Sequence, residues 1–264
     1  MESNNNGASG ACDVKTFVRN RYFYGKLLDV YHFELEQNYF NAKRWLLNRL
    51  VTGYGVICGL GVSAGSDGQS IVVEAGVAID KWGREIIAPT ASKPLALPPL
   101  PPATPGTPSA DHPASDCNCD EHWVHLLICY HECLSDPVPA LGGDCDQNAT
   151  CSPGSVRERY ELEFKEGKLP AVDVSCSVPD LVSGTAINYP ALAQYISSPC
   201  PDCPDDPCIA LANIHLPDPG GALASGSIDI AVRPIVYTND LLHDLLVCLT
   251  NKPATQDHLR GGKS

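Results

Sequence analysis

Cysteine is the residue type in this chain best suited to special chemistry, with 13 copies among 264 residues. Cys145 and Cys151 enclose a polar loop, and Cys200, Cys203 and Cys208 lie in the segment SPCPDCPDDPC. A C-x2-C spacing lets two thiolates bind one tetrahedral zinc ion. One pair from each loop, Cys145 and Cys151 with Cys203 and Cys208, would complete a structural zinc site, with Cys200 as the alternate ligand.

Disulfides within or between the same two loops are the alternative, and free thiols are a third, because spacing alone does not separate them. The N-terminal sequence MESNNNGASGACD lacks the basic start and apolar core of a secretion signal. We therefore expect synthesis and assembly in the cytoplasm, where disulfides are rare during folding. A protein released later would meet oxidising surroundings. Whether these cysteines bind zinc or form disulfides, their predicted role is structural.

A second group of metal-ligand residue types contains Cys117, Cys119, His122, His125 and His131. A catalytic zinc needs three protein ligands and an open position. His125, however, lies inside an apolar run of strand length. A histidine in such a place is more often hydrogen-bonded locally than bound to a metal, so we do not expect a catalytic zinc here.

Other catalytic patterns are missing from the sequence. There is no His-Glu-x-x-His pair, no Walker A loop and no G-x-S-x-G elbow. Asp80 and Glu85 lie near a predicted turn, where carboxylates are usually solvated. Cys58, Cys129 and Cys248 have apolar neighbours and are expected to be buried thiols. We therefore expect a protein that is not an enzyme.

The elements that would position these residues begin with one long helix. Asp29 stands at the N-cap position, and apolar residues recur behind it at helical spacing: Leu35, Tyr39, Ala42, Leu46 and Leu50. The apolar stripe must pack on something, either the protein's own sheet or a partner. Strands are expected at 56–64, 70–79 and 83–88, with a tight reversal at 80–83.

The chain as a whole predicts an α+β protein. A flexible tail (1–17) precedes a helix and β-meander unit (18–93), and a proline-rich linker or arm follows (94–116). A cysteine-rich, mainly β region (117–251) has strands expected near 123–130, 160–164, 171–176, 208–216 and 227–232. It closes with a C-terminal helix capped by Thr238 or Asn239 and ending near Leu249, and a second tail covers 252–264.

Charge is divided unevenly along the chain, whose net charge is −13. Residues 1–93 hold ten Lys and Arg against nine Asp and Glu, whereas residues 94–264 hold eight against twenty-two. An acidic surface repels phosphate backbones and anionic lipid, so nucleic acid binding is not expected. No apolar run approaches the ~18 residues of a membrane-spanning helix, so direct membrane insertion is not expected either.

The sequence resembles a bacterial family whose members are often encoded with contractile, phage-tail-like injection particles (extracellular contractile injection systems). The matching segments are RNRYFYGKLL (19–28), FELEQNYF (33–40), NRLVTGYGVICGLGV (48–62), VVEAGVAIDKWGREI (72–86), RERYELEF (157–164), PDDPCIALANIHL (204–216) and RPIVYTNDLLHDLL (233–246). The resemblance implies a structural component of such a particle, at the baseplate or an end of the tube. Its partners would be other particle subunits, in several symmetric copies, and release within a particle would make it extracellular. The alternative is a ligand- or carbohydrate-binding β module, or a cargo, that travels with such particles.

The expected contact with another subunit is the aromatic and basic segment before the helix. It contains Arg21, Tyr22, Phe23, Tyr24 and Lys26, which is more apolar area than an isolated helix and strand normally leave exposed. Like charges on the acidic remainder would push copies apart unless they are neutralised. Subunit contacts are therefore expected to draw mainly on residues 15–93.

Overall fold

The computed structural model describes residues 14–100, 122–139, 151–174, 182–183 and 186–251, and it confirms the α+β class. The helices are α1 (Val30–Leu47), α2 (Tyr189–Ile196) and α3 (Asn239–Asn251), with a π-helix, η2 (Asn48–Thr52), and a 3-10 turn, η3 (Ser225–Ser227). The strands are β1 (Gly55–Gly59), β2 (Val62–Ala64), β3 (Ser70–Val73), β4 (Gly76–Ile79), β5 (Glu85–Ala88), β6 (Leu95–Ala96), β7 (Trp123–Pro139), β8 (Cys151–Glu166), β9 (Val182–Ser183), β10 (Ala186–Ile187), β11 (Ile209–His215) and β12 (Ile228–Asp229).

The central sheet has the antiparallel order β12-β11-β7-β8. Successive side chains of a strand point to opposite faces. Leu126 and Ile128 accordingly enter the main core, whereas Leu127 packs in a smaller cluster on the other side. The run 123–130 thus forms a strand that is buried on both faces. The predicted strand at 171–176 is not formed over its described residues, 171–174.

Two small sheets, β1-β4-β5 and β2-β3-β6, form the N-terminal β unit. The predicted strands 56–64 and 70–79 are each divided between them, and two glycines explain the division. A Cβ atom on Gly59 would lie 2.0 Å from the carbonyl oxygen of Ala75, and one on Gly76 would lie 2.4 Å from that of Cys58. Only glycines allow the two backbones to approach this closely as they turn from one sheet into the other.

One hydrophobic core joins both halves of the chain. Ile71 and Ile86 from the N-terminal unit are in the same buried cluster as Leu126, Leu211 and Ile214 from the central sheet. The two regions predicted on either side of the proline-rich stretch therefore share a core. Each small sheet has too little apolar area to be stable alone, and packing them together removes that area from water.

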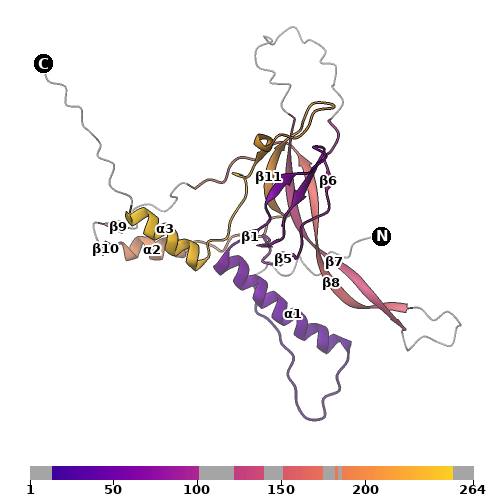
Figure 1. The fold of residues 1–264 in the computed structure, drawn as a ribbon. Coiled ribbons are helices and arrows are strands. Elements are labelled where there is room, and N and C mark those ends of the chain that lie inside the picture. The colour runs from indigo at the N-terminus through magenta and orange to yellow at the C-terminus, as the bar shows by residue number, and fades with distance from the viewer. Residues whose placement is uncertain (1–13, 101–121, 140–150, 175–181, 184–185, 252–264) are drawn as a thin grey trace, which may run out of the picture.

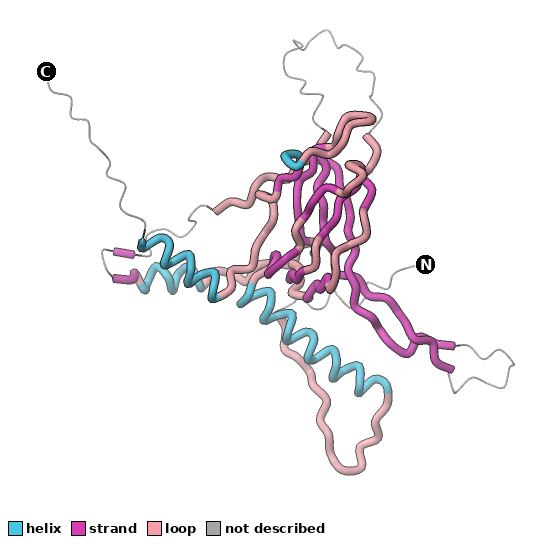
Figure 2. Tube along the Cα trace, in the orientation of Figure 1, coloured by secondary structure: helices cyan, strands magenta, loops and turns pink. Residues whose placement is uncertain are grey.

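Three arms project from this body in different directions (Figures 1 and 2). One is α1 with the loop that precedes it, the second is the far half of the β7-β8 hairpin, and the third carries α2 and α3. Neither α1 nor α2 contains a buried residue. The predicted apolar stripe of α1 is half-buried at Leu35, Tyr39, Ala42 and Leu46 and exposed at Leu50.

The predicted helix starts are confirmed at both ends of the chain. Asp29 caps α1 by accepting from the backbone N–H of His32, at 3.3 Å. Thr238 Oγ1 accepts from the backbone N–H of Leu241 at the start of α3, at 3.2 Å. Within the described part of the chain, no helix is both long and apolar enough to cross a membrane.

Candidate interaction surface

The α1 arm is a helix with its own N-terminal loop folded against it. The ring of Phe17 packs edge-on against that of Tyr39, with centroids 6.4 Å apart, and Lys43 Nζ lies over both rings. The Tyr22 hydroxyl donates to Glu36. These contacts fix the loop to the helix, so the arm presents a defined surface instead of a loose chain.

The predicted contact residues lie at the tip of that loop. A turn closed by the backbone N–H of Lys26 donating to the Phe23 carbonyl, at 3.1 Å, presents Phe23 and Tyr24 to solvent. Tyr24 is fully exposed, and Tyr22 and Phe23 are each more than half exposed. The same arm has further exposed apolar side chains: Val18, Leu27, Val30, Tyr31, Phe33, Phe40 and Leu47. This many exposed apolar side chains on one arm are typical of a protein contact.

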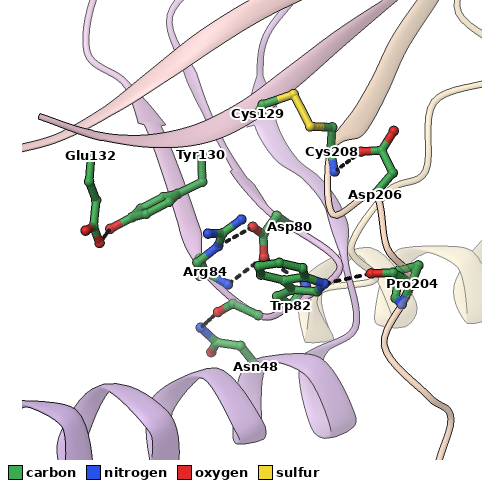
Figure 3. A network of polar contacts seen from close by, with 11 residues as sticks. Asn48, Asp80, Trp82, Arg84, Cys129, Tyr130, Glu132, Pro204, Asp206 and Cys208 are labelled. Carbon is green, nitrogen blue, oxygen red and sulfur yellow. Dashed lines mark hydrogen bonds and ion pairs between the residues drawn. A yellow bond between two sulfur atoms is a disulfide. The ribbon is translucent and has the colours of Figure 1, made fainter. Parts of the chain in front are cut away.

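A buried ion pair lies where the arms meet the body (Figure 3). Asp80 is fully buried and accepts from the backbone N–H groups of Trp82 and Arg84, at 2.9 and 2.8 Å. Its second oxygen accepts from Arg84 Nε at 2.6 Å. The Arg84 guanidinium lies between the rings of Trp82 and Tyr130, 4.7 and 4.5 Å from their centroids. We call residues 80–84 the hub.

The hub holds the base of α1 directly. Asn48 Nδ2 donates to the Gly83 carbonyl at 2.9 Å and to Glu85 at 2.8 Å, and Arg44 Nε pairs with Glu85 at 3.0 Å. A Cβ atom on Gly83 would lie 2.1 Å from the carbonyl oxygen of Trp45. The backbone of the turn therefore packs on the last turn of the helix, and this sets the direction of the arm.

The hub also holds the segment that leads from α2 into the body. Trp82 Nε1 donates to the Pro204 carbonyl at 2.8 Å, and the backbone N–H of Lys81 donates to the Pro207 carbonyl at 3.0 Å. One turn between β4 and β5 thus connects the α1 arm, the β7 strand and the segment behind α2. It fixes the directions of these arms relative to one another.

The cysteines do not form the predicted four-thiolate set. Cys208 forms a disulfide with Cys129, and Cys203 is also disulfide-bonded. Cys151 and Cys200 are free thiols, and Cys145 lies outside the described residues. Cys151 ends the far part of the β7-β8 hairpin, nine residues from Tyr160, or about 30 Å at the rise of a strand.

The expectation of buried thiols at Cys58, Cys129 and Cys248 was wrong. Cys129 is buried, but it is oxidised, while Cys58 and Cys248 are exposed free thiols. Apolar neighbours in sequence indicate burial only if the element packs on the core, and α3 does not.

The described histidines of the second predicted metal group do not form a metal site. His125 is buried, and its Nδ1 lies 2.9 Å from the Gly167 carbonyl oxygen, as expected for a histidine satisfied in its strand. His131, six residues further along β7, lies 3.5 Å from Glu161. Cys117 and Cys119 fall outside the described residues. Across the described ranges, no three His, Cys, Asp or Glu side chains gather as a metal site requires.

No known protein family, curated protein or solved structure matches the chain. Three consecutive aromatics are unusual in a loop, and they indicated the exposed tip of the α1 arm. The turn at 80–83 was predicted as well, but we expected Asp80 to be solvated, and the structure buries it. The sign that could have shown this is an arginine four residues after the aspartate, placed to pair with it across the turn.

The hub should give stability a pH dependence. Burial raises the pKa of Asp80 above its ordinary value, although Arg84 and the backbone donors oppose the rise. The folded protein then binds this proton more tightly than the unfolded chain does. This contribution to stability is therefore complete below the unfolded pKa and is lost as the pH rises through the folded pKa.

The Asp80→Asn variant cannot titrate at this position. We expect the free energy of unfolding of the wild type, minus that of Asp80→Asn, to increase between about pH 7 and about pH 4. Urea titrations at several pH values measure this difference, and a constant or decreasing one would contradict the assignment.

Proposed function

We propose that this protein is a non-catalytic structural component of a contractile, phage-tail-like injection particle, at its baseplate or an end of its tube. The observation that carries the proposal is the α1 arm, an 18-residue helix without one buried residue, whose loop exposes Phe23 and Tyr24 at its tip. Exposing this apolar area to water is unfavourable for a monomer. A subunit that buries the area against a neighbour gains stability from it.

The construction of the arms supports the same proposal. Long elements that extend from a small core can reach neighbouring subunits, and the hub holds them in fixed directions. The disulfide between Cys129 and Cys208 suits a protein that is released within a particle into oxidising surroundings. The resemblance of segments 19–28, 33–40, 48–62 and 72–86 to proteins encoded with such particles supports the kind of assembly.

A ligand-binding β module is the second candidate, because a pocket of about 660 Å³ opens beside Trp123, Phe164 and Lys168. Sugar recognition would use an exposed aromatic platform in this sheet. The Trp123 ring is already covered by Lys168 Nζ, 4.0 Å from its centroid, and packs against His215. Among the described residues of β7, β8, β11 and β12, no aromatic side chain is exposed. The exposed aromatics of the α1 arm therefore favour the structural role.

Replacing Tyr22 and Tyr24 with serine should remove most of the chain from purified particles while the isolated protein keeps its thermal stability. Both hydroxyphenyl rings are exposed, so their loss leaves no cavity, but it removes apolar area from a contact. The variant also loses the hydrogen bond from Tyr22 to Glu36, while Phe17 still holds the loop on Tyr39 of the helix. The measurement is the amount of the chain that sediments with particles from a host that lacks its own copy. Deletion of the gene should give absent or truncated particles in negative-stain images.

The matched control replaces two exposed apolar residues of the body, Ile87 and Ile230, with serine. It removes apolar area from water-facing positions outside the arm, so incorporation should be unchanged. Normal incorporation of the Tyr22 and Tyr24 variant would refute the proposed contact, and intact particles after gene deletion would refute the structural role.

A further inference from the structure

The α1 arm is basic on a chain that is otherwise acidic. Residues 14–52 hold seven Lys and Arg against three Asp and Glu, a net charge of +4, although the whole chain carries −13. Three of the basic residues, Lys15, Arg19 and Arg21, are exposed on the loop beside the aromatic tip. The arm therefore combines exposed aromatic area with positive charge.

The arm that carries α2 and α3 has the opposite charge. Within 186–206 and 237–251 there are five aspartates and no Lys or Arg. One of them, Asp206, already pairs with Lys165, which leaves four on the surface: Asp202, Asp205, Asp240 and Asp244. Exposed apolar side chains lie on the same two helices: Tyr189, Tyr195, Ile196, Leu242, Leu245 and Leu249.

Within one chain the two arms meet at their bases, where Arg49 Nη1 donates to the Pro201 carbonyl at 3.0 Å, but their outer surfaces point apart. Both arms start near the hub, but α1 extends away from α2 and α3 (Figures 1 and 2). The base of α1 is fixed by Asn48 and Arg44, so the arm cannot swing round to the other side. A second copy of the chain can bring the two surfaces together.

We propose that the basic α1 arm of one copy docks on the acidic α2-α3 arm of the next, in a head-to-tail contact. This proposal deepens the structural role above and rests on it. Pairing like with like is disfavoured, because two α1 arms would bring their exposed basic side chains together and two α2-α3 arms would bring their aspartates together. A head-to-tail contact places different surfaces against each other, so it propagates into a ring or a helical stack. It also neutralises part of the charge by which acidic copies repel each other.

Charge reversal in the purified full-length chain tests the contact. The basic-arm variant carries Arg19→Glu and Arg21→Glu, and the acidic-arm variant carries Asp202→Lys and Asp244→Lys; all four side chains are exposed. In about 50 mM salt the wild type should self-associate in sedimentation velocity, and each variant alone should associate about tenfold more weakly or worse. An equimolar mixture of the two variants should associate again, because each reversed arm then meets its complement. A wild type that stays monomeric, or a mixture that does not recover, would overturn the proposal.

A photo-crosslinking amino acid in place of Tyr24 identifies the docked surface. Head-to-tail docking requires cross-links between copies to residues 186–206 or 237–251. Cross-links to the α1 arm of another copy, or to a part of the body outside these two ranges, would overturn the proposal. This outcome can be separated from failure of the proposed function. If the Tyr22 and Tyr24 variant is lost from particles while the purified chain does not self-associate, the arm binds a different subunit and only the head-to-tail contact is refuted.

Discussion

Replacing Asp80 with alanine is expected to lower the free energy of unfolding by about 3–5 kcal/mol, because it leaves the charge of a buried guanidinium without its partner. Asp80 is fully buried and accepts three hydrogen bonds from Trp82 and Arg84. Arg84, which has only about a tenth of its side chain exposed, would keep its two aromatic neighbours but lose its counter-charge. Urea denaturation measures the loss.

Asp67 provides a matched control in another turn of the same unit. Its Oδ1 accepts from the backbone N–H of Gln69 at 2.9 Å and from Ser70 Oγ at 2.7 Å, but its side chain is exposed and has no ion pair. Asp67→Ala should therefore destabilise the protein much less than Asp80→Ala, because water can replace the hydrogen bonds of an exposed carboxylate. Equal losses for the two variants would show that the hub contributes no more than an ordinary turn.

A double-mutant cycle separates the ion pair from the turn. Replacing both Asp80 and Arg84, with alanine and methionine respectively, removes the unpaired charge as well as its partner. The double variant should be less destabilised than the sum of the two single variants, because a buried pair is most costly when only one partner is removed. Additive losses would mean that Asp80 acts through its backbone hydrogen bonds alone.

Local signals made part of the fold predictable from sequence. The caps of α1 and α3 are set by Asp29 and Thr238, and their hydrogen bonds span only three residues. The reversal at 80–83 is similarly local, with the Gly83 N–H donating to the Asp80 carbonyl at 3.0 Å. The alternation of Leu126 and Leu127 between two clusters follows from strand geometry.

Contacts between distant residues could not be predicted in the same way. Whether Asp80 is solvated depends on Tyr130 and on the segment around Pro204, which pack over its turn. A helix pattern indicates that one side of α1 must be buried without saying against what. In the structure the N-terminal loop covers part of the stripe, with Phe17 packed on Tyr39.

The partner of Cys208 illustrates the same limit. C-x2-C spacing pointed to Cys203 and a nearby loop, whereas the bond joins Cys208 to Cys129, 79 residues earlier. Both belong to the small cluster that also contains Leu127, Ala210 and Val232, on the face of the central sheet opposite the main core. The pairing is therefore decided by the register of β7 with β11, where Ile209 lies opposite Ile128, and not by sequence spacing.

This disulfide gives the second large effect that we expect. Replacing Cys129 and Cys208 with alanine should lower the free energy of unfolding by about 2–5 kcal/mol, because the bond closes a long loop and so restricts the unfolded chain. Alanine is chosen because both sites are buried and a serine hydroxyl would be left without a partner there. The segment that connects α2 to the body should become the first site of cleavage in limited proteolysis.

The same variant shows whether oxidation or metal stabilises the segment. Reductant should destabilise the wild type by more than it destabilises the double variant, whose remaining response reports the bond of Cys203. Chelator should leave both proteins unchanged, because a disulfide holds without an ion, whereas a zinc site needs deprotonated thiols and loses its metal to the chelator.

If chelator loosened the wild type while reductant did not, the thiols around Cys208 would bind metal and the disulfide assignment would fail. If neither reagent had an effect, the hydrogen bonds from Trp82 and Lys81 to this segment would be sufficient to hold it. In that case the predicted loss of 2–5 kcal/mol would also fail.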